Sequence, residues 1–160
     1  MESGYYDIAQ VCHNGHVISA MAGSSHEFRE KYCSKCGEAS IMACTNCNEH
    51  IPGHYHVPGV IGFHKYDPPA FCHNCGKPFP WTERKEQAAI DLFVDEIQDK
   101  EERRVFEESI KQLSKDTPQA KVAANRITKL VGKLAAGTGE VVKKLVIDVA
   151  SETIKKTIFH

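Results

Sequence analysis

Residues 33–47 read CSKCGEASIMACTNC and contain two Cys-x-x-Cys motifs, and a third such motif, CHNC, occupies residues 72–75. Two thiolates separated by two residues can hold one ion from a single tight turn, and a structural zinc site needs four such ligands. Gly37 and Gly76 directly follow two of the pairs, where this kind of turn often requires a positive φ. Three pairs therefore supply one complete site and half of another.

The missing half-site lies upstream of the first pair. Cys12 and His16 are separated by three residues, and Gly15 lets the chain turn back between them. His13 is an alternative ligand next to Cys12, but the longer spacing of His16 closes a better loop. We therefore predict two structural Zn²⁺ ions per chain, with no ligand to spare, bound by Cys12, His16, Cys33, Cys36, Cys44, Cys47, Cys72 and Cys75.

The order of the ligands favours two successive zinc ribbons. The first pair of half-sites would be joined by the 16 residues 17–32, and the second by the 24 residues 48–71. The alternative is a cross-brace, in which the first half-site joins the third and the second joins the fourth. Cross-brace domains usually have a very short spacer between their middle pairs, whereas seven residues separate Cys36 from Cys44 here.

The overall composition is that of a soluble protein. The 160 residues carry a net charge of −1, which argues against a generic polyanion binder. There is no apolar run of about 18 residues that could span a membrane, and the first residues do not resemble a secretory signal. We expect a cytoplasmic protein, and in that compartment paired cysteines are more often metal ligands than disulfides.

Composition divides the chain near Trp81, because no cysteine follows Cys75. We expect a double zinc-ribbon region over residues 1–81 and a helical region over residues 82–160 that serves as an interaction or oligomerisation module. Net charge is −2 over residues 1–81, −4 over 82–116 and +5 over 117–160. The acidic and basic stretches either face each other or form separate solvated helix faces.

The segments between the half-sites predict short β-hairpins. Residues 17–20 and 28–32 would flank the first site, and residues 51–57 and 60–63 would pair across a turn at Pro58 and Gly59. Apolar residues are few, so metal binding must supply much of the folding free energy, on the order of 10 kcal/mol per site.

Histidines and aromatic residues crowd the second ribbon. We interpret His50, His54, His56 and His64 as exposed imidazoles rather than a further metal site, because no carboxylate lies among them at a suitable spacing. Six aromatic residues would fill the thin core, or alternatively stack on unpaired bases: Tyr55, Phe63, Tyr66, Phe71, Phe79 and Trp81.

Four helices are predicted after Trp81, which gives a small α+β protein. Thr82 would cap the first, Asp99 with Glu102 the second, and Thr117 before Pro118 the third. The fourth would run from residue 140 to residue 158 after a break at residues 137–139. It is apolar on two sides, with Val142, Leu145, Val146 and Val149 on one, and Ile147, Ala150, Ile154 and Ile158 on the other. Such a helix is buried on several faces, against its own chain, a second copy or a partner.

The sequence resembles an uncharacterised bacterial family of double zinc-ribbon proteins with a helical tail, a domain of unknown function. The resemblance rests on GYYDIAQVC at residues 4–12, NGH at 14–16, YHVPGV at 55–60, FCHNCGKPFPWT at 71–82 and VIDVASE at 146–152. It implies sequential ribbons and metal roles for the eight residues named above. It implies no activity.

Three functional classes compete. A non-enzymatic protein-interaction or scaffolding module fits the near-neutral charge and the wide apolar arc of the last helix, which would contact another protein or a second copy of the chain. The alternative is a nucleic-acid-binding zinc-ribbon protein, which the basic residues 117–160 favour and the net charge of −2 over residues 1–81 opposes. An enzyme is not expected, because eight ligands fill both coordination spheres. We expect neither a membrane partner nor a small-molecule substrate.

Overall fold

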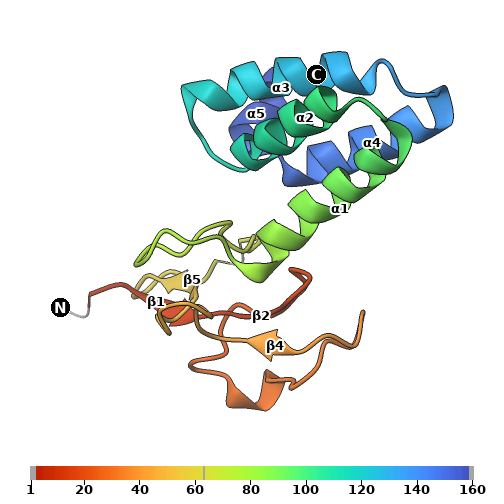
Figure 1. The fold of residues 1–160 in the computed structure, drawn as a ribbon. Coiled ribbons are helices and arrows are strands. Elements are labelled where there is room, and N and C mark those ends of the chain that lie inside the picture. The colour runs from red at the N-terminus through yellow and green to blue at the C-terminus, as the bar shows by residue number, and fades with distance from the viewer. Residues whose placement is uncertain (1–2, 63, 159–160) are drawn as a thin grey trace. The chain divides into compact units, whose positions relative to one another are not determined.

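The computed structural model describes residues 3–62 and 64–158, and the chain divides into two compact units, Met1–Trp81 and Thr82–His160 (Figure 1). The first unit contains short antiparallel strand pairs, and the second contains only helices among its described residues. Each unit has a hydrophobic core of its own. The protein is therefore a small α+β protein. No helix in the described part of the chain is long and apolar enough to cross a membrane.

The strands of the first unit form two small antiparallel sheets. Their bounds are β1 Tyr5–Ile8, β2 Gln10–Cys12, β3 Val17–Ser19, β4 Ser40–Ile41 and β5 Pro52–His56. One sheet has the order β3-β2-β4, and the other pairs β1 with β5. Strand β2 is the centre of the three-stranded sheet and ends at Cys12, so it fixes the position of the first metal-ligand candidate.

The predicted hairpins are only partly correct. Strands β3 and β5 lie where residues 17–20 and 51–57 indicated, but β5 pairs with β1 and not with the segment that follows the turn. Residues 60–62 form no strand, Ile61 is 95% exposed, and Phe63 lies outside the described residues. Residues 28–32 are also not a strand: a 3₁₀ turn, η1, covers His26–Phe28.

Cross-strand aromatic pairs account for the choice of partner by β5. Tyr6 lies opposite Tyr55 with the ring centroids 4.7 Å apart, and Tyr5 stacks on His56 at 4.8 Å. Such pairs stabilise an antiparallel ladder.

The core of the first unit is thin. It consists of Ala9, Val11, Cys44, Ile51, Cys72, Phe79 and Trp81. Phe79 and Trp81 are stacked with their centroids 4.6 Å apart, and the Trp81 indole N–H donates to the Pro69 carbonyl at 3.0 Å. These two rings occupy the core as predicted, and Tyr66 packs partly against it, whereas Tyr55 is exposed.

The second unit contains five helices among the described residues. They are α1 Pro80–Glu96, α2 Lys100–Leu113, α3 Pro118–Val131, α4 Ala136–Val149 and α5 Glu152–Ile158. The Asp99 side chain caps α2 as predicted, accepting the Glu102 N–H at 2.8 Å. Helix α1 begins at Pro80, two residues before the predicted cap Thr82. The break predicted at residues 137–139 is wrong, because these residues form the first turn of α4.

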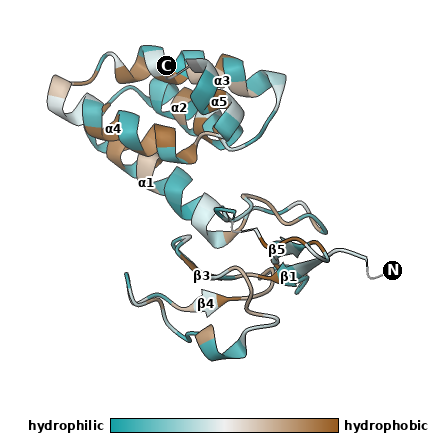
Figure 2. Ribbon diagram, turned by 180° about the vertical axis from the view of Figure 1, so that it is seen from behind, coloured by the Kyte–Doolittle hydropathy of each residue, from teal (hydrophilic) through white to brown (hydrophobic). Residues whose placement is uncertain are grey.

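The predicted fourth helix is divided at Ala150 and Ser151 into α4 and α5. The Ser151 N–H donates to the Leu113 carbonyl at 2.8 Å, and the Ser151 hydroxyl accepts the Ile154 N–H at 3.4 Å. A serine that accepts from the first turn acts as a helix N-cap, so Ser151 ends one helix and starts the next. Figure 2 shows hydrophobic and hydrophilic residues interspersed along α4.

The turn at Ser151 lets both apolar sides of the predicted helix pack within the chain. Val142, Val146 and Val149 on α4 enter the core, and so do Ala150 and Ile154. This core contains a stacked pair, Phe93 and Phe106, with centroids 3.9 Å apart. In the second apolar stripe, Ile147 is half-buried, and the side chain of Ile158 lies outside the described part of the structure.

Candidate metal centres

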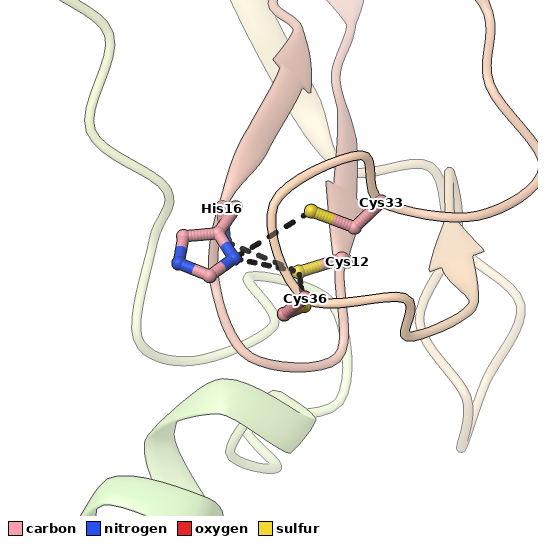
Figure 3. Close-up of side chains that lie close together, drawn as sticks. All are labelled: Cys12, His16, Cys33 and Cys36. Atoms are coloured by element: carbon pink, nitrogen blue, oxygen red, sulfur yellow. Dashed lines mark hydrogen bonds between the residues drawn. The ribbon is translucent and has the colours of Figure 1, made fainter.

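The eight predicted ligands gather into two clusters in the first unit. One contains Cys12, His16, Cys33 and Cys36, and the other contains Cys44, Cys47, Cys72 and Cys75. Within each cluster the ligand atoms all lie within 4.8 Å of one another. Figure 3 shows the four side chains of the first cluster pointing toward one another. The grouping is sequential, not interleaved as a cross-brace would require.

The three Cys-x-x-Cys turns share one backbone geometry. The residue after each pair has a positive φ: 74° at Gly37, 63° at Asn48 and 70° at Gly76. Its N–H donates to the carbonyl of the first cysteine at 2.8 to 2.9 Å. Two of these positions are glycines, as predicted, and Asn48 is the residue that the sequence analysis missed. Asparagine is among the few other residues that adopt this conformation readily.

The Cys12 turn differs but reaches the same result. Gly15 has a φ of 87°, and its N–H donates to the Cys12 carbonyl at 2.9 Å. A Cβ atom on Gly15 would lie 3.0 Å from Cβ of Trp81, so both its φ and the close approach require glycine. The turn brings Nδ1 of His16 to 3.5 Å from the Cys12 sulfur.

The distances between ligand atoms fit a tetrahedral ion. At the usual zinc–ligand distances, a regular tetrahedron has sulfur–sulfur edges of about 3.8 Å and sulfur–nitrogen edges of about 3.5 Å. The sulfur atoms of Cys12 and Cys36 are 3.7 Å apart, and Nδ1 of His16 is 3.6 Å from the Cys33 sulfur. In the second cluster, the Cys44–Cys75 and Cys47–Cys72 sulfur distances are 3.7 and 3.6 Å. None of these pairs is a disulfide.

Burial and backbone hydrogen bonds shift the pKa values of the thiols in opposite directions. Burial raises the pKa of Cys12, and it raises the pKa of Cys72 to about 11. The Glu38 N–H lowers the pKa of the exposed Cys36 to about 6, and the backbone at Lys77 does the same for Cys75. A buried thiol becomes a thiolate ligand only if a cation compensates its charge, so these clusters suit a bound metal ion.

Asparagine side chains support one sulfur in each cluster. Asn14 donates its Nδ2 hydrogen to the Cys36 sulfur at 3.4 Å, and Asn74 donates to the Cys47 sulfur at 3.5 Å. Each asparagine is the last residue of a Cys-His-Asn sequence. Each contacts the second cysteine of the other turn in its cluster. The Cys-His-Asn sequence therefore has the same role in both clusters.

Replacing His16 and replacing His13 with alanine should have different effects on the first cluster. His16→Ala removes the only nitrogen donor and should cost one metal ion per chain or weaken that site at least tenfold, while the second cluster keeps its ion. His13→Ala should leave both sites intact, because the His13 ring lies outside the cluster, 3.9 Å from the Glu38 carboxylate. Competition with a chromogenic chelator measures both affinities. Loss of metal in the His13 variant alone would reverse the ligand assignment.

The buried carboxylate of Asp7 contacts His56 of β5, and the sequence analysis did not detect this contact. Asp7 lies opposite this strand and accepts from Ile8 N–H at 2.7 Å, Gly23 N–H at 2.8 Å and the Ser24 hydroxyl at 2.5 Å. Nε2 of His56 is 3.1 Å from the same carboxyl group. Burial raises the pKa of Asp7, but these hydrogen bonds outweigh it and leave the pKa below its ordinary value.

Asp7→Asn should destabilise the metal-loaded first unit by about 1–3 kcal/mol, because buried donors lose a charged acceptor. A lowered pKa means that this stabilisation is fully present at neutral pH, above the unfolded value of about 3.9, and is lost as pH falls through the folded value. Denaturant unfolding followed by Trp81 fluorescence measures it. The control is Asp67→Asn, which removes an exposed ion pair with Lys65 and should cost less than about 1 kcal/mol. Equal effects would contradict a structural role for Asp7.

Comparison with protein families identifies a match over most of the chain. The model of a family described as an uncharacterized protein conserved in bacteria (DUF2321) matches residues 5–158. No curated protein matches the chain significantly, and no solved structure does.

Proposed function

The chain belongs to the bacterial family DUF2321, whose function is uncharacterised, and we propose that it is a non-enzymatic protein-interaction module built on two structural zinc ions. The donor sets support zinc as the metal. Four sulfurs, or three sulfurs and one imidazole nitrogen, in tetrahedral arrangement are typical of zinc. Each set already supplies four ligands, which leaves no position for substrate or water. The role proposed for the metal is therefore structural.

The observation that carries the interaction function is an open groove in the second unit, of about 1150 Å³. Its lining includes the apolar side chains of Ile127, Val131, Leu134, Val146 and Ile147. Ile147 belongs to the stripe that the sequence analysis assigned to an interface, whereas Ile154 from the same stripe is buried in the core. A groove with an apolar floor and a polar rim is a common docking surface for a protein segment. The helical unit would thus bind a partner through α3 and α4.

Metal analysis and site-specific crosslinking test this proposal. Purified protein should contain two equivalents of zinc per chain. A photoreactive amino acid in place of Leu134 should give a discrete protein adduct in cells, and the same amino acid in place of the exposed Lys111 should not. Adding Ile147→Glu should remove the adduct. An adduct of twice the chain mass would identify a second copy as the partner, and no adduct at all would contradict the interaction function.

Exposed tyrosines favour the second candidate, nucleic-acid binding. Tyr5, Tyr6 and Tyr55 are all exposed on β1 and β5, where they can stack on unpaired bases. The net charge of −2 over residues 1–81 opposes this, because phosphate contact needs Lys or Arg. Electrophoretic retardation of single-stranded probes at low salt, lost in a Tyr6→Ala, Tyr55→Ala variant, would support nucleic-acid binding over the first proposal.

A further inference from the structure

The groove is long enough to hold a short helix. Its lining on α3 runs from Lys121 to Val131, which corresponds to about 15 Å at the helical rise of about 1.5 Å per residue. A helix of about ten residues has roughly this length, so the α3 wall is long enough for one. Most of the lining residues are exposed or half-buried, so the groove is open and does not enclose its occupant.

The rim of the groove is positively charged. Lys121 stands on the α3 wall and Lys143 on the α4 wall, and neither has an ion-pair partner among the described residues. The lining contains a single carboxylate, Glu140. By contrast, Lys133 outside the lining is paired with Glu102 of α2. The unpaired lysines are therefore available to carboxylates of an occupant.

A second copy of the chain fits this groove poorly. Helices α1 and α2 carry no large hydrophobic side chain that is exposed among the described residues, so they have nothing to insert. The exposed apolar residues of the helical unit are Val122 and Val141, which belong to α3 and α4 themselves. An occupant helix needs apolar anchors and acidic flanks on the same segment. The exposed apolar residues of the first unit lie on strands, loops and the 3₁₀ turn η1, so no described α-helix of a second copy meets this need, and the occupant comes from another protein.

We propose that the groove between α3 and α4 binds an acidic amphipathic helix of a partner protein, with apolar anchors against Val131, Leu134 and Ile147 and carboxylates beside Lys121 and Lys143. Helices bind such grooves through residues at positions i, i+3, i+4 and i+7. This inference rests on the proposed interaction function and specifies the chemistry of the partner. It is independent of the metal sites.

Two designed peptides test the proposal with the full zinc-loaded chain. Both carry leucine at i, i+3, i+4 and i+7, one with flanking glutamates and the other with lysines at the same positions. Fluorescence anisotropy at low salt should show the glutamate peptide binding at least tenfold tighter. Lys121→Glu with Lys143→Glu should reverse this preference, and Ile147→Glu should weaken both peptides at least tenfold. Lys129→Glu on α3, outside the lining, is the matched control and should change neither affinity more than twofold. Circular dichroism and zinc content confirm that each variant is folded.

Several outcomes would overturn the acidic helix as occupant. These are equal binding of the two peptides, a preference that survives the double charge reversal, or no binding of either peptide at millimolar concentration. Decanoate binding to the groove without peptide binding would identify an amphipathic small anion instead. The crosslink from position 134 decides the proposed function separately: an adduct together with peptide failure would retain the interaction module and reject only the acidic helix.

Discussion

Stripping the metal from the protein with a high-affinity chelator should unfold residues 3–62 and 64–81 while the helical unit keeps its structure. The first unit has a core of seven residues, two of which are cysteines from the second cluster. Its strands are two to five residues long, so sheet hydrogen bonds add little. Each structural zinc site contributes on the order of 10 kcal/mol in small zinc domains, as much as the total stability of a typical domain. Without the ions, the remaining core is too small to stay folded.

The single tryptophan makes this expectation measurable. Trp81 is buried in the core of the first unit, so its fluorescence and near-ultraviolet circular dichroism report on that unit. Both should change to unfolded values on chelation, while the far-ultraviolet helix signal from α2 to α5 persists, and zinc addition should restore them. Cys44→Ser removes one ligand of the second cluster and should lose one equivalent of metal. It is therefore intermediate between the metal-loaded and the metal-free protein. An unchanged Trp81 signal in metal-free protein would show that the ions are not structural.

The metal ligands could be predicted from sequence because each half-site is local. Two cysteines three positions apart, or a cysteine and a histidine four apart, meet within one turn whatever the rest of the chain does. The turn residues are equally local: Gly15, Gly37 and Gly76 were identified, and Asn48 was missed only because asparagine is less diagnostic of a positive φ. The pairing of half-sites followed from the lengths of the spacers.

Contacts between distant residues were not predictable in the same way. β1 pairs with β5, and Asp7 meets His56 although 49 positions separate them. Strand pairing depends on the competing partners, and the sequence offered residues 60–63 as the nearer one. No carboxylate lies near His56 in the sequence, because its partner is on another strand. The aromatic residues of β1, which pair with rings on β5, were the signal that favoured β1 as the partner strand.

The apolar pattern of the last predicted helix did not decide what covers it, because a wide apolar arc has two explanations. Either an external partner covers it, or the chain bends and covers it internally. Ser151 followed by Glu152 is a helix-start signal, and it points to the second explanation. The structure divides the apolar residues accordingly: Ile154 is 1% exposed in the core, and Ile147 lines the groove. Two isoleucines that looked equivalent in sequence therefore have different roles.

Alanine substitution of these two isoleucines should separate the core from the groove. Ile154→Ala leaves a cavity between α5 and the core and should cost about 2–5 kcal/mol. Ile147→Ala removes a half-buried side chain whose space opens to solvent, so it should cost less than about 1 kcal/mol. Denaturant unfolding of zinc-loaded protein, followed by far-ultraviolet circular dichroism, measures both. Peptide binding provides the converse readout, because Ile147→Ala should weaken it and Ile154→Ala should not while the protein is folded. Equal destabilisation by the two changes would mean that Ile147 belongs to the core, and the groove would then lose an apolar anchor on its α4 wall.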